Sequence, residues 1–197
     1  LANAAGIRVF ATGGIGGVHR GDVLDVSADL VALGRTPLVV VCSGVKSLLD
    51  VPGTLERLET EGVAVLGWRT DAFAAFYAAD SGRPVSARVE GAEAVAAIAR
   101  ARDALALAHA ILVAVPVPEA QAMAADEVEG AVATAIAEAA AGGVSGADVT
   151  PFVLARMAEL TDGRSLAANA ALLVNNARVA AEIALALDNG RPRLRLV

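Results

Sequence analysis

Apolar runs and helical patterns alternate along this chain. Short apolar runs of β type occur at Ile7–Thr12, Pro37–Cys42, Val63–Trp68 and Ile111–Val115. The continuous ones among them are typical of strands buried on both faces of a parallel sheet. Apolar positions at helical spacing predict helices within Val23–Gly34 and over Pro52–Glu61, Gly91–Ala108, Asp126–Ala141, Pro151–Leu160 and Ser165–Asp188. This alternation predicts an α/β protein with a three-layer α/β/α arrangement and a mostly parallel (mixed) sheet.

The pattern also bears on domain organisation. It shows no internal repeat and no linker, so we expect one domain over residues 1–197. The clearest loop is the Gly-Gly-Val-Ser-Gly segment at residues 142–146. The tail from Asn189 to Val197 contains helix breakers and three arginines, and we expect it to be peripheral.

Polar residues follow three of the predicted strands directly. Thr12 and a glycine cluster follow the first strand, Ser43 and Lys46 follow the second, and Arg69 and Thr70 follow the third. Ligands of open parallel sheets bind at the carboxyl ends of the strands. The order of residues therefore predicts a site where these groups converge.

Composition narrows the possible partners and the setting. The formal net charge of −6 argues against a nucleic-acid surface. The one cysteine, Cys42, lies in an apolar run, which favours a small buried hydrophobe over a reactive thiol and fits a reducing, cytoplasmic setting. The apolar runs at Pro37–Cys42 and Ala104–Val117 are shorter than a membrane span, and no signal peptide is recognisable. Because Leu1 falls in what reads as the middle of an element, we expect processing, truncation or a fragment.

Four glycines, Gly13, Gly14, Gly16 and Gly17, follow the first strand. Such a turn can expose backbone N–H groups to a phosphate, but the spacing matches neither a dinucleotide-binding fingerprint nor a Walker A loop. A tight structural turn explains the glycines equally well. His19 and Arg20 come directly afterwards, and both can donate to an anion.

Two further groups could carry chemistry. Asp22, Asp25 and Asp29 lie close together with Ser27, which suits a hard divalent cation, although Asp and Ser are equally favoured as helix caps. Lys46 is the one lysine of the chain, and a partly buried lysine can act as a nucleophile that forms a Schiff base, which arginine cannot do.

Three asparagines lie along the last predicted helix. Asn169 and Asn176 are seven residues apart and share a helix face, where they could face a ligand together with Asn175 nearby. Hydrogen bonds within the core or at a cap are the alternative.

Several sequence blocks, taken in order, resemble those of pseudouridine-5′-phosphate glycosidases, the indigoidine synthase A-like family. They are FATGGIGGVHRG, DVSADL, VVVCSGVKSLLD, LETEGVAVLGW, VPVPE and TPFVLARMAELTDGRSLAANAALLVNNARVAAEIA, and they cover about Gly6 to Ala184. The resemblance implies reversible cleavage of the C–C glycosidic bond of pseudouridine 5′-phosphate to uracil and ribose 5-phosphate. It also implies a small-molecule substrate, a homotrimer, and neither a nucleic-acid nor a membrane partner.

The resemblance assigns roles to particular residues. Lys46 would form an imine with C1′ of the opened ribose, and Asp25 would hold Mn²⁺ or another divalent cation largely through waters. The remaining matched positions would contact substrate, with Asn169 at the uracil edge; they are Thr12, His19, Ser27, Ala28, Asp29 and Asn169. An imine supplies the electron sink that breaking a C–C bond requires.

The chain departs from the family pattern in two respects. A glutamate proton donor and a second lysine precede the glycine block in the family and have no counterpart here, and Val115 stands where an asparagine is common. The alternative reading is therefore a non-catalytic remnant that folds, oligomerises and binds a sugar phosphate. A general nucleotide-binding module, suggested by the glycines alone, is a third reading.

Overall fold

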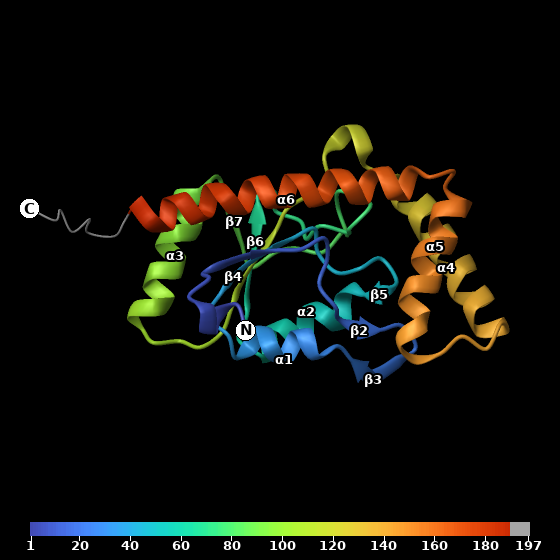
Figure 1. Ribbon diagram of the computed structural model, residues 1–197, viewed down its shortest axis with the longest axis horizontal. Helices are drawn as coiled ribbons and strands as arrows, with labels where there is room; N and C mark the ends of the chain where they lie inside the picture. The colour runs from blue at the N-terminus through green and yellow to red at the C-terminus, as the bar shows by residue number, and fades with distance from the viewer. Residues whose placement is uncertain (190–197) are drawn as a thin grey trace, which may run out of the picture.

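The computed structural model describes residues 1–189, apart from the side chains of Asp22, Val23 and Ala147. The expectation about the tail beyond Asn189 therefore lies outside the described residues, as does any role for the Asp22 carboxylate. The fold has the α/β character expected from the sequence, and Figure 1 shows its layers.

A five-stranded parallel sheet forms the centre of the fold. Its strands run in the order β1 (Val9–Ala11), β4 (Val39–Cys42), β8 (Ile111–Ala114), β6 (Ala64–Trp68) and β7 (Ala87–Val89). All four neighbouring pairs are parallel, with Val40 opposite Phe10 on one side and Leu112 on the other. The predicted apolar strands are confirmed, whereas β7 was not predicted because Ala-Arg-Val is short and carries a charge.

Helices cover both faces of this sheet, as the sequence predicted. One face, with Val39 and Val41, packs against α3 (Ala92–Ala104) and α6 (Arg164–Asn189). The other face, with Val40 and Cys42, packs against α1 (Ala28–Gly34) and α2 (Val51–Thr60) and continues toward α4 (Ala125–Ala141) and α5 (Val149–Leu160). In Figure 1, α6 runs along the top of the molecule, α1 and α2 lie below, and α4 and α5 stand at the right.

A second, smaller sheet was not predicted. It pairs β2 (Val18–His19) antiparallel with both β3 (Asp22–Val26) and β5 (Leu49–Asp50). Two of these strands have two residues each, which is too short for a periodic pattern to be visible in the sequence. This sheet joins the segment after the glycines to the segment after Lys46.

Capping residues and one left-handed residue set the ends of several helices. Ser27 caps α1, and Asp50, which was not singled out, caps α2 by accepting a hydrogen bond from the Gly53 N–H. Helix α3 stops at Ala104 instead of Ala108, because Ala106 adopts a left-handed φ of 52°. Short 3₁₀ turns occur at Asn3–Ala5 (η1), Glu119–Gln121 (η2) and Gly146–Asp148 (η3).

Helix α6 combines a length of 26 residues with a largely apolar composition. Within residues 1–189 it is the one helix that is long and apolar enough to cross a membrane by length and composition, and the apolar runs considered above did not include it. Its inner face, however, is part of the protein core, where Val179 and Ile183 are fully buried. Packing against the sheet and α3 thus accounts for the apolar inner face, whereas Leu173, Val174 and Leu185 of the same helix are exposed.

Candidate active site

Lys46 lies in a turn that follows strand β4. Its N–H donates to the Ile15 carbonyl at 3.1 Å, and its own carbonyl accepts from the Leu49 N–H at 3.0 Å. Val45 pairs with Ile15 in a parallel bridge just before the turn. The backbone of Lys46 is therefore held on both sides, and its side chain is half-buried.

A cavity of about 430 Å³ lies beside Lys46. Its polar lining includes Thr12, Asp29 and Lys46, three of the residues predicted for the site. Its apolar lining includes Phe10 of β1, Val40 of β4 and Leu33 of α1, together with Leu38 just before β4 and Leu1 at the start of the described residues. We call this cavity the Lys46 cavity. The structure thus brings part of the predicted site together in it, near the carboxyl ends of β1 and β4.

The glycine cluster is explained by contacts within the protein. A Cβ on Gly14 would lie 2.7 Å from the Phe76 ring, and a Cβ on Gly17 would lie 2.3 Å from Oγ1 of Thr54. Real Cβ atoms do not approach other atoms so closely, so larger residues would displace these side chains. The structure therefore supports the tight structural turn, and Gly14 also lines the Lys46 cavity.

Ser27 and Asp29 secure this glycine turn from helix α1. The Ser27 hydroxyl accepts a hydrogen bond from the Asp29 N–H at 3.2 Å, as an N-cap does. The Asp29 carboxylate accepts from the Gly16 N–H at 2.8 Å. Ser27 is therefore the N-cap of α1, whereas Asp29 lies in the first turn of the helix and binds the glycine turn, and Ala28 between them is exposed.

Asp25 and His19 face each other across strands β3 and β2. Nδ1 of His19 lies 3.8 Å from a carboxylate oxygen of Asp25, whose side chain is 62% exposed. Neither residue lines the Lys46 cavity. Among the described side chains, no three His, Cys, Asp or Glu residues gather closely enough to hold a metal ion. Because the Asp29 carboxylate already binds the glycine turn, Asp25 would offer a cation a single carboxylate ligand. A cation bound there would keep most of its waters.

The asparagines on α6 divide into different roles. Asn176 is fully buried, and its Nδ2 donates to the Thr12 carbonyl at 2.9 Å and contacts the Ser43 hydroxyl at 3.1 Å. It therefore ties the carboxyl ends of β1 and β4 to α6, as the core alternative predicted. Asn169 is half-buried, and its Oδ1 faces Gly13, where a Cβ would lie 3.5 Å away. Asn175 donates to the Pro116 carbonyl at 3.4 Å.

Three other residues noted in the sequence are engaged in packing or hydrogen bonding outside the Lys46 cavity. Burial raises the pKa of the Cys42 thiol to about 12, which agrees with the expected buried hydrophobe. Val115 is buried against the opposite face of the sheet, in the cluster that includes Val179 of α6. Arg69 turns away from the site, because its guanidinium lies 5.5 Å from the centre of the Trp68 ring and its Nε donates to the Glu90 carbonyl.

Phe76 is a residue of this region that the sequence did not indicate. It adopts a left-handed φ of 62°, and its N–H donates to the Ser43 carbonyl at 2.8 Å. Its ring contacts Gly14 and packs edge-on against Tyr77, with the ring centres 4.6 Å apart. Phenylalanine rarely takes a positive φ, so tertiary packing determines this conformation and no local pattern could reveal it.

The family of the chain follows from comparison with known proteins. The family model described as indigoidine synthase A like protein matches residues 1–186. The chain belongs to the indigoidine synthase A-like family. This confirms the resemblance drawn from the sequence blocks.

Two pseudouridine-5′-phosphate glycosidases are similar in sequence to this chain. The pseudouridine-5′-phosphate glycosidase of Methylobacterium nodulans is 56% identical over 192 residues, which cover 96% of this chain and 57% of that protein. The pseudouridine-5′-phosphate glycosidase of Symbiobacterium thermophilum is 54% identical over 197 residues, which cover 97% of this chain and 64% of that protein.

Two crystal structures show the same fold. The prealnumycin C-glycosynthase AlnA, solved in complex with ribulose 5-phosphate, has a TM-score of 0.88 at 39% identity and covers 95% of this chain and 63% of its own. An indigoidine synthase A-like protein of Thermotoga maritima has a TM-score of 0.87 at 40% identity, covering 96% of this chain and 62% of its own. The chain thus spans about three-fifths of the length of these relatives.

Proposed function

We propose that this chain carries the lysine part of an active site that reversibly cleaves pseudouridine 5′-phosphate to uracil and ribose 5-phosphate. The observation that carries the proposal is the placement of the one lysine, Lys46, in a cavity with Thr12 and Asp29. The names of the two relatives described above support the substrate. The ribulose 5-phosphate bound to the C-glycosynthase supports a pentose phosphate as the ligand class.

The chemistry assigned to Lys46 is imine formation. Unprotonated Nζ forms a bond to C1′ of the ribose, and the ring oxygen leaves C1′ and takes up a proton. The nitrogen then loses a proton, and its lone pair forms the C=N bond to C1′ as the C1′–C5 bond breaks. The electron pair of the broken bond passes to C5 of uracil, which takes up a proton to give the free base. Water hydrolyses the resulting imine, which releases ribose 5-phosphate and restores Lys46.

The other predicted residues complete this proposal. Thr12, Ser27, Ala28 and Asp29 would contact the sugar phosphate, while His19 and Asn169 would contact substrate from β2 and α6. Asp25 would hold a divalent cation such as Mn²⁺, which supplies positive charge near the substrate oxygens when bound. We further propose a cytoplasmic homotrimer, for which sedimentation of the purified protein is the direct measurement.

One observation favours the alternative of binding without turnover. Among the described residues, Asp29 is the one carboxylate that lines the Lys46 cavity, and it already accepts a hydrogen bond from Gly16. The cavity therefore offers no free carboxylic acid to protonate a leaving carbon. A positioned general acid contributes roughly 10²–10⁴-fold to a rate. We accordingly expect imine formation by this chain to exceed its complete turnover.

The single lysine makes a direct test possible. The protein is incubated with ribose 5-phosphate and cyanoborohydride, and peptide mass spectrometry locates the reduced adduct. Only Lys46 and the N-terminal amine can form such an adduct, so the N-terminus serves as an internal reference. We expect rapid modification of Lys46, and no adduct at position 46 in Lys46→Arg.

Release of uracil from pseudouridine 5′-phosphate, with and without Mn²⁺, measures turnover in parallel. An adduct on Lys46 without uracil release would support the non-catalytic alternative. Modification of Lys46 no faster than that of the N-terminal amine would contradict the proposed function.

A further inference from the structure

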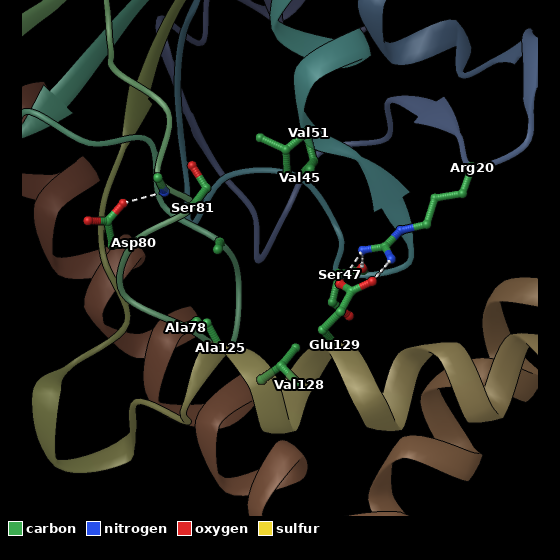
Figure 2. Close-up of a pocket in the computed structure, with 12 residues that line it drawn as sticks. Arg20, Val45, Ser47, Val51, Ala78, Asp80, Ser81, Ala125, Val128 and Glu129 are labelled. Atoms are coloured by element: carbon green, nitrogen blue, oxygen red, sulfur yellow. Dashed lines mark hydrogen bonds and ion pairs between the residues drawn. The ribbon is translucent and has the colours of Figure 1, made fainter.

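Arg20 reaches from the end of strand β2 to the turn that carries Lys46. Its Nη2 donates to the Ser47 carbonyl at 3.0 Å, and its Nε donates to the Leu49 carbonyl at 3.3 Å. Figure 2 shows this guanidinium between Ser47 and helix α4, at the edge of a separate cavity of about 350 Å³. Both carbonyls lie in the Lys46–Leu49 turn, in which the Leu49 N–H donates a hydrogen bond to the Lys46 carbonyl. Arg20 therefore fixes peptide groups that immediately follow the lysine.

Glu129 of α4 holds Arg20 in place. The carboxylate accepts one hydrogen bond from Nη1 and a second from Nη2, the latter at 3.0 Å. Hydrogen bonding to Arg20 lowers the pKa of Glu129, which keeps the carboxylate charged. A bidentate pair restricts the guanidinium to one plane, whereas a lysine at the same position would offer only a point charge.

The pair is too exposed to contribute much to overall stability. The side chains of Arg20 and Glu129 are 33% and 61% exposed, and such ion pairs are usually worth little because solvent screens them. Their notable property is geometric, because one planar group connects α4, β2 and the Lys46 turn. Arg20 is also largely occupied by these partners, so it is poorly placed to serve as the anion donor suggested by the sequence.

We propose that Arg20 and Glu129 are positioning residues, which orient the Lys46–Leu49 turn so that the amine of Lys46 points into its cavity. The inference deepens the function proposed above and rests on the nucleophilic role of Lys46. Displacement of a reacting group by about 1 Å can reduce a rate by about 10²-fold, so small rotations of this turn matter for chemistry even where the fold tolerates them.

Helix α4 offers a matched control for the test. Glu127, two residues before Glu129, forms the same kind of bidentate pair with Arg164 of α6. Within the described residues, neither member of that pair forms a hydrogen bond or ion pair with the Lys46 turn. Glu127→Gln therefore removes an equivalent carboxylate from the same helix, while Glu129→Gln and Arg20→Met remove the proposed positioning contacts.

The first experiment measures the rate of cyanoborohydride trapping on Lys46 as a function of ribose 5-phosphate concentration. We expect the maximal rate to fall by about 10- to 100-fold in Arg20→Met and Glu129→Gln, with the half-saturating concentration little changed, because misorientation slows attack more than binding. Arg20→Lys should not restore the rate, because it lacks the fork. Glu127→Gln should match the wild type. Wild-type rates in both Arg20→Met and Glu129→Gln would overturn the proposal.

The second experiment does not depend on imine chemistry. Reductive methylation with ¹³C-formaldehyde labels only Lys46 and the N-terminus, so each amine gives its own NMR resonance. We expect the Lys46 resonance to shift or broaden in Arg20→Met and Glu129→Gln but not in Glu127→Gln. An unchanged resonance in both positioning variants would overturn the inference. Failure of the wild type to trap ribose 5-phosphate would instead contradict the proposed function, and the resonance would still decide whether the pair orients Lys46.

Discussion

At the scale of single residues, the glycine turn approaches its neighbours more closely than a side chain would permit. A Cβ on Gly16 would lie 2.1 Å from Oγ of Ser27 and 3.0 Å from the Asp29 carboxylate. Both neighbours are engaged, since Ser27 caps α1 and Asp29 binds the Gly16 N–H. Relief of the clash would therefore disturb the helix cap and the turn together.

We predict that Gly16→Ala destabilises the protein by about 1–3 kcal/mol, the range expected for overpacking a close contact. Gly130→Ala is the control, because a Cβ at this position in α4 would meet open space. Alanine is the better helix former, so Gly130→Ala should raise the free energy of unfolding by about 0.5–1 kcal/mol. Urea denaturation of the two variants measures both effects. A Gly16→Ala variant as stable as the wild type would show that the turn can move away from Ser27 at little cost.

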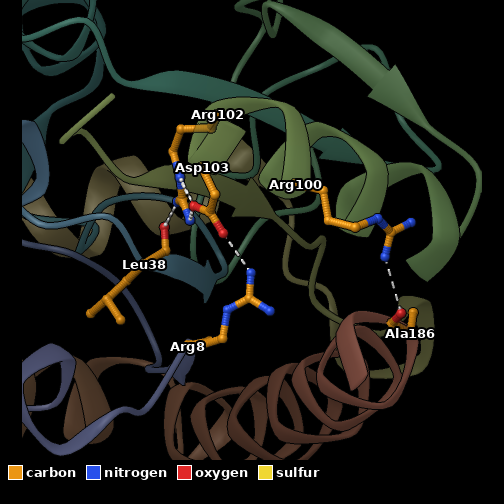
Figure 3. Close-up of polar contacts among 6 residues, drawn as sticks. All are labelled: Arg8, Leu38, Arg100, Arg102, Asp103 and Ala186. Carbon is orange, nitrogen blue, oxygen red and sulfur yellow. Dashed lines mark hydrogen bonds and ion pairs between the residues drawn. The ribbon is translucent and has the colours of Figure 1, made fainter. Parts of the chain in front are cut away.

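At the scale of secondary-structure elements, helix α3 is tied to the start of the sheet by a buried arginine (Figure 3). Arg102 is 4% exposed, and its Nη1 donates to the Leu38 carbonyl, just before β4, at 2.8 Å. Its Nε and Nη2 bind Asp103, which also receives a hydrogen bond from Arg8 ahead of β1. The network joins α3 to the approaches to two parallel strands, at the end of the Lys46 cavity that Leu38 lines and not at the strand ends that carry Thr12 and Lys46.

Removing this arginine should weaken the fold without removing any side chain proposed to contact substrate. We predict that Arg102→Met lowers the free energy of unfolding by about 1–3 kcal/mol, because the Leu38 carbonyl loses a charged donor in a buried setting. Arg100→Met, two residues earlier on α3, loses only a 3.3 Å hydrogen bond to the Ala186 carbonyl and should change stability by no more than about 0.5 kcal/mol. Thermal and urea denaturation compare the two. Equal losses in both variants would contradict a specific role for Arg102.

At the scale of the whole molecule, unfolding is coupled to titration of two buried groups. Burial raises the pKa of the Cys42 thiol from 9.0 to about 12, and burial raises the pKa of the Tyr77 hydroxyl from 10.0 to about 12. Both residues belong to the core cluster on the α1 and α2 side of the sheet. The folded state therefore keeps protons that the unfolded state releases once the pH exceeds the ordinary values.

The free energy of unfolding should therefore fall as the pH rises through the alkaline range. A raised pKa in the folded state leaves stability intact below pH 9.0 and lowers it as the pH rises toward about 12. Each group contributes a slope of at most about 1.4 kcal/mol per pH unit in that window. Urea denaturation between about pH 8 and about pH 11 should show this loss, and the slope should become shallower in Cys42→Ala and in Tyr77→Phe. A slope unchanged in both variants would contradict the coupling.

The pattern of apolar residues was sufficient for most of the layered fold. Continuous runs such as Val39–Cys42 identify central parallel strands, because both faces of these strands are buried. Helical spacing and end residues identified helices on both faces, including the Ser27 cap. The two-residue strands and the left-handed end of α3 were not predictable, because they depend on contacts with distant segments.

The candidate site shows the same division. The sequence by itself determined the residue types that can act, since one lysine follows a buried strand and its neighbouring blocks match the family. Only the tertiary structure decided that Thr12 and Asp29 share a cavity with Lys46. It also decided that the buried Asn176 hydrogen-bonds to the end of β1, and that Arg20, held by Glu129, contacts the Lys46 turn. The physical reason is that residue chemistry and local periodicity are encoded along the chain, whereas these pairings join residues up to 164 positions apart and arise only when the sheet brings its strand ends together.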